Sequence, residues 1–320
     1  MLAKEEYWTP MRAACLFLLA GLLGAMPVAA ASKNPEIVTV PCPQKRKLND
    51  EKRFQAFVIR TYRGDHPDVD FNDCIQVLRH QRVVFSEAAE GRITIGNDIN
   101  GGFEQEKGAY QPPAVPLGRD ITGLGKPNLI FSVWSGGAHC CYTFHILELG
   151  DRVREIAKVD AADSDYAHFE DVNKDGIYEF VGWDFTFAYW HAGFNGSPAP
   201  VIVLRFNGAG YELAPDLMRK PAPSAEELGK KREKVRHADW TDGYPPPLLW
   251  GTMLNLIYTG HSELAWRFVS DAWMPVRTPK KTFLRDFCGQ LARSPYFDEL
   301  RPTIVDAPCE FNPKYGEQSD

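Results

Sequence analysis

The sequence predicts a mainly β fold that is followed by a C-terminal α-helical segment. Between residues 54 and 215, short aromatic and β-branched runs alternate with Gly, Asn and Asp clusters, which is typical of strands joined by turns. Within this region, the loop 171–179 is rich in Asp, Asn and Gly and is flanked by strand-like residues. Beyond the Pro-rich stretch 215–223, apolar residues recur at helical spacing.

The loop 171–179, which reads D-V-N-K-D-G-I-Y-E, has the pattern of a cation site. Oxygen-bearing side chains stand at its first, third, fifth and ninth positions, and a glycine at the sixth permits a tight turn with positive φ. Ca²⁺ prefers six to eight oxygen ligands, which include backbone carbonyls such as that of the seventh residue. The loop therefore predicts a Ca²⁺ site whose ligands are Asp171, Asn173, Asp175, Ile177 and Glu179.

This loop has two other interpretations. An EF-hand requires a carboxylate at position twelve and a helix on each side, but position twelve is Gly182 and the flanking residues are strand-like. The loop therefore ends at Glu179 and joins two strands. A turn of the Asp, Asn and Gly type without any metal stays as the alternative.

The loop, its strand flanks and Phe169 two residues before it resemble an FG-GAP/VCBS-type repeat, the blade unit of the integrin α-subunit β-propeller. Repeats of that family carry D-x-[DN]-x-D-G-x-x-[DE] between strands. The resemblance covers about one repeat well and residues 95–215 more weakly. It implies β-propeller-like blades, calcium that stiffens the loops, and surface loops that meet partners.

A second loop, 120–128, is a degraded relative of the first. It keeps Asp120 at position one and Gly125 at position six, but Leu124 and Asn128 replace the carboxylates at positions five and nine. The same turn without strong metal binding is expected there. Asp120 and Asp171 are 51 positions apart, which suits the length of a propeller blade.

The predicted strands divide into blades. One blade would use strands 129–134, 142–149 and 153–159, and the next would use 180–189, 201–206 and 211–213. In strand 180–189, alternate aromatic residues would face a β core. A strand at 54–63, a hairpin at 74–86 and a strand at 93–95 suggest a third blade, whereas a closed propeller needs at least four. Diverged blades and a partial propeller capped by helices are both open.

The chain is expected to have four regions. Residues 11–31 combine a cation, an apolar core too short to span a bilayer and a small-residue cleavage site, so a signal peptide over 1–31 is expected, with no later transmembrane span. The β region covers 32–215. A helical region at 216–310 starts at Ser224 and continues at 248–258, 263–273 and 280–293, and a disordered tail covers 311–320.

Six cysteines follow the signal peptide: Cys42, Cys74, Cys140, Cys141, Cys288 and Cys309. An even number in an exported chain indicates disulfides. Proximity favours the pairs 42–74 and 288–309, which leaves Cys140 and Cys141 as a vicinal bridge, thiols or a redox switch. A zinc site with His139 and His145 is a less favoured alternative, because no second Cys pair stands at ligand spacing.

Two functions are compatible with this sequence. The net charge of −6 argues against general binding of nucleic acid or anionic membranes. The favoured hypothesis is an exported, periplasmic or secreted calcium-binding module that binds a protein or glycan partner without catalysis. The alternative is an exported hydrolase with its site at the blade loops. The candidate residues are His139, Asp163, Asp165, His168, Asp184 and His191.

Overall fold

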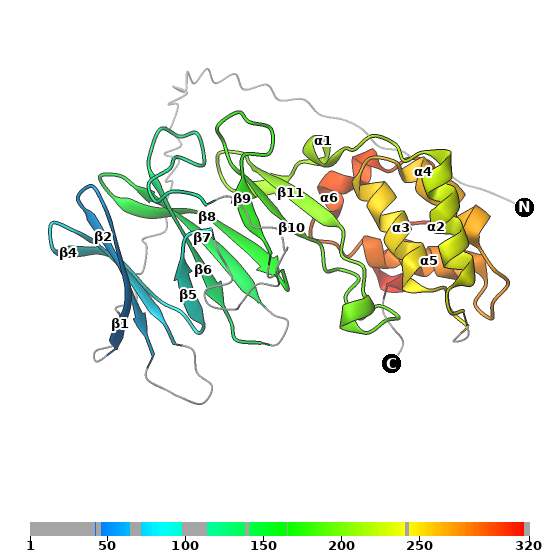
Figure 1. Cartoon of the computed structure of the whole chain (residues 1–320), viewed down its shortest axis with the longest axis horizontal. Helices are drawn as coiled ribbons and strands as arrows, with labels where there is room; N and C mark the ends of the chain where they lie inside the picture. Colours follow the sequence, from blue (N-terminus) through cyan, green and yellow to red (C-terminus); the bar gives the residue numbers. More distant parts are fainter. Residues whose placement is uncertain are drawn as a thin grey trace, which may run out of the picture. The chain divides into compact units, whose positions relative to one another are not determined.

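Three antiparallel sheets and a group of helices make up the fold (Figure 1). The computed structural model describes residues 42, 46–64, 72–97, 114–137, 141–164, 166–240 and 243–316. All of these belong to one unit that spans Thr39–Asp320. The predicted signal peptide lies outside the described residues.

Each sheet contains four strands, and strands that follow one another in sequence are neighbours in the sheet. The first sheet contains β1 Lys47–Phe54, β2 Phe57–Arg63, β3 Cys74–Arg79 and β4 Arg82–Ala88. The second sheet contains β5 Arg92–Ile95, β6 Asn128–Trp134, β7 Tyr142–Leu149 and β8 Val153–Ala162. The third sheet contains β9 His168–Glu170, β10 Glu179–Trp183, β11 Val201–Phe206 and β12 Tyr211–Leu213. The mainly β prediction is confirmed, and β1 is a strand that the sequence analysis missed.

The second sheet is buried on both faces, because alternate residues of its strands enter two different cores. Phe131 and Leu147 pack against Ile59 and Val77 of the first sheet. On the opposite face, the ring of Phe144 meets those of Phe169 and Phe180 in the third sheet edge to face, with 5.5 Å between centroids. The second sheet therefore lies between the first and the third.

The helices extend the core of the third sheet. They are α1 Pro215–Met218, α2 Ala225–His237, α3 Pro247–Tyr258, α4 Ser262–Ala272, α5 Lys280–Leu291 and α6 Phe297–Leu300, with short 3₁₀ turns at 194–196, 301–303 and 313–315. One cluster of buried apolar residues includes Ile202 of β11, Leu249 of α3 and Phe287 of α5. The predicted start of α2 is confirmed, since Ser224 and Glu227 form a capping box. None of these helices is long and apolar enough to span a bilayer.

Two details differ from the sequence-based expectations. The strand predicted over 180–189 ends at Trp183, so the aromatic residues beyond it do not share one strand face. The carboxylate of Asp184 turns back to accept from Thr186 N at 2.8 Å, and this turn takes the chain out of the sheet. The tail expected to be disordered from residue 311 is ordered to Gly316, because Phe311 packs against Phe297 and Pro313–Tyr315 forms a 3₁₀ turn.

The described part of the chain contains three four-stranded sheets and no closed barrel or propeller. At least four blades are needed to close a propeller. The coarse expectation of a mainly β fold followed by a helical segment is therefore confirmed, and the expectation of propeller-like blades stays a prediction.

Two predicted disulfides are present, Cys42–Cys74 and Cys288–Cys309. Cys141 is also disulfide-bonded, whereas Cys140, its predicted vicinal partner, lies outside the described residues. Disulfides of this kind persist in oxidising compartments.

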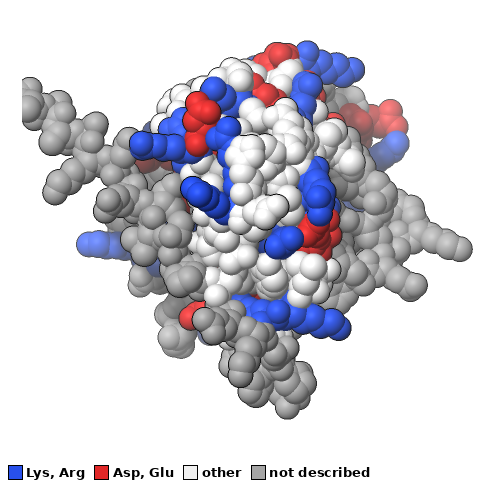
Figure 2. All heavy atoms as spheres, turned by 90° about the vertical axis from the view of Figure 1, so that its left-hand side faces the viewer, with Lys and Arg blue, Asp and Glu red and all other residues white. Residues whose placement is uncertain are grey.

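Charge is unevenly spread over the sheets. The strands of the first sheet carry more basic than acidic residues, although the whole chain has a net charge of −6. Figure 2 shows this side of the molecule, where Lys and Arg surround an area without charged residues. Many of these cations have partners: Arg53 and Arg60 both contact Glu51, and Arg63 Nη1 lies 2.7 Å from Asp73. Because Arg53 and Arg60 share one carboxylate, these ion pairs neutralise only part of the basic excess.

Candidate metal-binding loop

The loop 171–179 joins β9 to β10, as the sequence predicted. Two of its carboxylates accept hydrogen bonds from backbone amides of the same loop. Gly176 N donates to Asp171 Oδ2 at 3.0 Å, and Val172 N donates to Glu179 Oε2 at 3.0 Å. Gly176 has a φ of +90°, which a residue with a side chain rarely adopts. These two hydrogen bonds connect position one to position six and position two to position nine.

The second oxygen of each of these two carboxylates has no hydrogen-bond partner. Asp171 Oδ1 and Glu179 Oε1 are both buried, and neither accepts a hydrogen bond. Glu179 as a whole is only 1% exposed. A buried carboxylate oxygen without a donor is costly, because the desolvation of its charge is not offset. A cation at this loop would remove that cost for both residues at once.

Asn173 and Asp175 lie at the exposed end of the loop. Asn173 Nδ2 donates to Asp175 Oδ2 at 2.9 Å, and the Ile177 amide donates to Asp175 Oδ1 at 2.8 Å. This amide, and then Asn173, hold the pKa of the Asp175 carboxyl below its ordinary value. Asp175 is therefore ionised at neutral pH, but it would have to turn from these donors to bind a cation with Asp171 and Glu179.

Burial raises the pKa of Glu179 above its ordinary value, and the nearby negative charge of Asp175 adds to this effect. Arg205 lowers it only weakly, because the guanidinium is already paired with Asp216 at 2.7 Å. Among the described residues, no ion pair neutralises the three carboxylates of this loop, although the guanidinium of Arg119 lies over the ring of Tyr178 beside it. The donor set consists of oxygens alone, which suits Ca²⁺.

The loop 120–128 has the same backbone design. Gly125 N donates to Asp120 Oδ2 at 2.7 Å, as Gly176 N does to Asp171. Ile121 N donates to Asn128 Oδ1 at 2.9 Å, as Val172 N does to Glu179. Positions four and six have positive φ in both loops, at Gly123 and Gly125 in one and at Lys174 and Gly176 in the other. The predicted relationship between the two loops is therefore visible in their hydrogen bonds.

The two loops differ at the ninth position and contact each other. The buried atom without a partner is a carboxylate oxygen in Glu179 but the amide nitrogen in Asn128, and an N–H₂ group cannot bind a cation. Tyr178 N donates to Ile121 O at 2.8 Å, so the loops lie side by side. The two loops are therefore neighbours that share a backbone design and differ at position nine.

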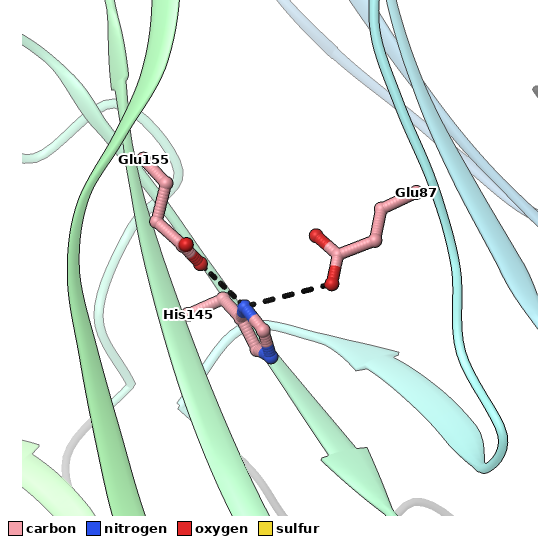
Figure 3. A group of neighbouring side chains, drawn as sticks. All are labelled: Glu87, His145 and Glu155. Atoms are coloured by element: carbon pink, nitrogen blue, oxygen red, sulfur yellow. Dashed lines mark hydrogen bonds and ion pairs between the residues drawn. The ribbon is translucent and has the colours of Figure 1, made fainter. Parts of the chain in front are cut away.

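In another group of residues, the potential metal-ligand atoms lie closer together than the carboxylates of the loop 171–179 do. The ligand atoms of Glu87, His145 and Glu155 all lie within 4.8 Å of one another (Figure 3), which those of Asp171, Asp175 and Glu179 do not. The zinc alternative, in which His145 joins Cys140 and Cys141, is not supported. His145 points its Nδ1 at Glu155 instead, and Cys141 is disulfide-bonded.

The residues considered for hydrolysis have structural partners where they are described. His168 is buried between Tyr166 O and Glu170, at 2.8 and 3.3 Å from its two ring nitrogens. Asp184 is 2% exposed and accepts from Tyr258 and Ser294 as well as from Thr186. Of the remaining candidates, Asp163 lines a cavity beside the third sheet, and the ring of His191 stacks on that of Tyr244 at 3.7 Å. His139 and Asp165 lie outside the described ranges.

One cavity adjoins the third sheet. It has a volume of about 490 Å³ and is lined by carboxylates and aromatic rings together, among them Asp160, Asp163, Trp183, Tyr211 and Tyr296. Tyr211 Oη donates to Tyr178 O at 3.2 Å, so the cavity is linked directly to the loop 171–179. Sequence reasoning missed this cavity, since its lining runs from Lys158 to Tyr296, which are 138 positions apart.

Comparison with known protein families, characterised proteins and solved structures finds no match. The resemblance to the FG-GAP/VCBS repeat therefore rests on the residues of the two loops and their strands.

Proposed function

We propose that this chain is an exported, calcium-stabilised β module that binds another macromolecule without catalysing a reaction. The observation that carries the proposal is the pair of buried, unpartnered oxygens on Asp171 and Glu179. Residues 171, 173, 175, 177 and 179 would supply the ligands for Ca²⁺. A calcium ion saturated by protein oxygens stiffens a loop but has no open position for an activated water.

The sheets fit the role of propeller-like blades. Strands β5–β8 and β9–β12 form two sheets with the same strand order, and each places its Asp-initiated loop before the second strand. The first sheet would be a third blade, stacked on the second. We infer a partial propeller whose open side is covered by the helices. The partner would be a protein or glycan of the cell envelope or exterior, met at the loops and the adjoining aromatic cavity.

The calcium part of the proposal is tested by thermal unfolding. Extracellular modules bind Ca²⁺ at about 10⁻⁴–10⁻³ M, so millimolar calcium is expected to stabilise the chain by about 0.4–1.4 kcal/mol. The melting temperature should rise with calcium and fall again with chelator. Asp175→Ala should abolish the rise, because it removes one of the proposed ligands. The carboxylate is exposed, so its loss should have little effect on the fold without the ion.

Asp120→Ala is the matched control. Asp120 occupies the same position as Asp171 in the sister loop and accepts from the Gly123 and Gly125 amides, so its loss lowers stability. It should leave the calcium-induced rise intact. Equal melting temperatures in calcium and in chelator would refute the calcium proposal.

A hydrolase is the second candidate, because the cavity places Asp160 and Asp163 beside aromatic rings. A panel of esterase, glycosidase, phosphatase and peptidase substrates in the presence of calcium separates the two functions. Turnover that disappears in Asp163→Asn, while the melting temperature stays unchanged, would replace the binding function with a catalytic one.

A further inference from the structure

A cluster of three potential ligands lies between the first and second sheets, away from the calcium loop. Glu87 comes from β4, His145 from β7 and Glu155 from β8 (Figure 3). His145 Nδ1 lies 2.5 Å from Glu155 Oε1 and 3.9 Å from Glu87 Oε1. The three ligand atoms lie within 4.8 Å of one another, and Glu87 comes from a strand that is distant in sequence from the hairpin of β7 and β8.

A β-bulge in β8 brings Glu155 into this cluster. Ile146 pairs with Ala157 and Leu147 pairs with Glu155, so Ile156 is the extra residue. Both Ile156 and Ala157 pack into the core shared with the third sheet. Glu155 is thereby turned to the face that carries His145 and Leu147. Re-aiming a side chain is a common use of bulges.

The imidazole of His145 is held in place. It is 4% exposed, and its ring stacks on that of Phe131 with 4.6 Å between centroids and 9° between planes. This stacking leaves the edge of the ring, with Nδ1, directed at both carboxylates (Figure 3). The ring is therefore oriented before any ligand arrives, which reduces the entropy lost on binding.

The charges around the cluster are unbalanced. Two carboxylates face one imidazole. Lys158 of β8 lies opposite His145 of β7 in the strand register, and its positive charge acts on Glu87 from the same face. Burial raises the pKa of Glu87, the charge of Glu155 raises it further, and His145 and Lys158 oppose these effects. The side chains of Glu87 and Glu155 remain 32% and 36% exposed, so an ion can reach them from solvent.

We propose that Glu87, His145 and Glu155 form a binding site for a divalent transition-metal cation of the zinc class. One imidazole nitrogen and two carboxylate oxygens suit Zn²⁺, whereas Ca²⁺ requires more oxygens. In a tetrahedral zinc site, ligand atoms lie about 3.3 Å apart. The 2.5 Å separation would widen and the 3.9 Å separation would close, which needs only small side-chain movements. Water would complete the coordination.

The bound ion would clamp the first sheet to the second, since its ligands come from both. This site is independent of the calcium loop and of the proposed function. His168 and Glu170 offer a comparison within the same chain, because there a buried histidine lies 3.3 Å from a carboxylate of its own strand.

The test is a titration of metal-free, full-chain protein with Zn²⁺ by calorimetry and with Co²⁺ by absorption spectroscopy. One ion per chain is expected, with the visible bands of tetrahedral Co²⁺. Glu87→Gln should weaken binding at least about tenfold, because removal of even a supporting group costs that much. This variant keeps the contact between His145 and Glu155, so its fold is preserved, and its circular dichroism spectrum verifies this.

Glu170→Gln is the matched control, and it should bind Zn²⁺ as the unchanged chain does. Asp175→Ala should also leave the zinc affinity unchanged, which separates this site from the calcium loop. The proposal is overturned if metal-free protein binds no Zn²⁺, in which case the cluster is a histidine–carboxylate hydrogen bond alone. It is equally overturned if Glu87→Gln and His145→Gln bind as tightly as the unchanged chain.

Discussion

At the scale of single residues, the ninth position separates the two sister loops. Glu179 and Asn128 each use one oxygen to accept the amide at position two of their loop. The remaining buried atom is an oxygen in the first case and a nitrogen in the second. At this position the side chain alone decides whether a cation would meet an oxygen or an N–H group, and Leu124 removes a second carboxylate from the sister loop at position five.

Calcium binding at Glu179 should depend on pH. Without calcium the folded pKa of Glu179 is raised by burial, so its ionisation lowers stability as the pH rises above the ordinary value of 4.5. Calcium binds the ionised form and depresses this pKa, so its stabilising effect is present at neutral pH and is lost on acidification. The calcium-induced rise in melting temperature should therefore grow from about pH 4.5 to pH 7. Thermal melts across this range, with calcium and with chelator, measure it. A rise that is constant with pH would contradict this account.

At the scale of elements, local patterns predicted most strands and helices correctly. β11 and β12 have the predicted bounds, and α2, α3, α4 and α5 begin within two residues of the expected positions, whereas the short helices α1 and α6 were not predicted. β1 was missed because its sequence, K-L-N-D-E-K-R-F, is polar on both faces, as befits an edge strand. The predicted strand after Glu179 was too long, because no pattern in the neighbouring sequence reveals that Phe187 packs against Phe287 of α5.

The candidate sites were predictable to different degrees. The loop 171–179 is contiguous, so its candidate oxygen ligands could be counted in the sequence. The cluster of Glu87, His145 and Glu155 depends on a sheet-to-sheet contact and a bulge, and neither leaves a signal at fixed spacing. The bulge contains no glycine that would mark it in the sequence. It allows both Ile156 and Ala157 to pack into the same core.

The shared design of the loops predicts that the sister loop can be converted into a calcium site. Leu124→Asp together with Asn128→Glu restores the missing carboxylates, while Asp120 and the hydroxyl of Thr122 already supply oxygens. The positive φ values at Gly123 and Gly125 show that the backbone is formed. The stoichiometry of calcium binding should increase by one ion per chain in equilibrium dialysis.

The matched control for this conversion is the neutral pair Leu124→Asn and Asn128→Gln, which should add no ion. If the charged pair also adds none while its circular dichroism spectrum is unchanged, the equivalence of the two loops is limited to their backbones.

At the scale of the whole molecule, the β and helical parts are joined by buried polar contacts as well as by the shared core. Asp184, just after β10, accepts from Tyr258 of α3 at 2.5 Å and from Ser294 beyond α5 at 2.6 Å. Gln290 of α5 also donates to Thr186 O. These partners are 74 to 110 positions apart, which is why Asp184 looked like a free candidate for chemistry in the sequence.

This connection predicts that the sheets and helices unfold together. Tyr258→Phe removes a donor to a buried carboxylate and should lower the free energy of unfolding by about 1–3 kcal/mol. Urea unfolding followed by circular dichroism reports the helices, and tryptophan fluorescence reports the aromatic core that includes Trp190 and Trp250. Because that core is continuous, both signals should shift to the same lower midpoint.

Tyr166→Phe is the control, since this ring is 43% exposed, and it should leave the midpoint unchanged. Two separate transitions in the unchanged chain would mean that the helices are stable without the sheets, and that the contacts of Asp184 do not couple them.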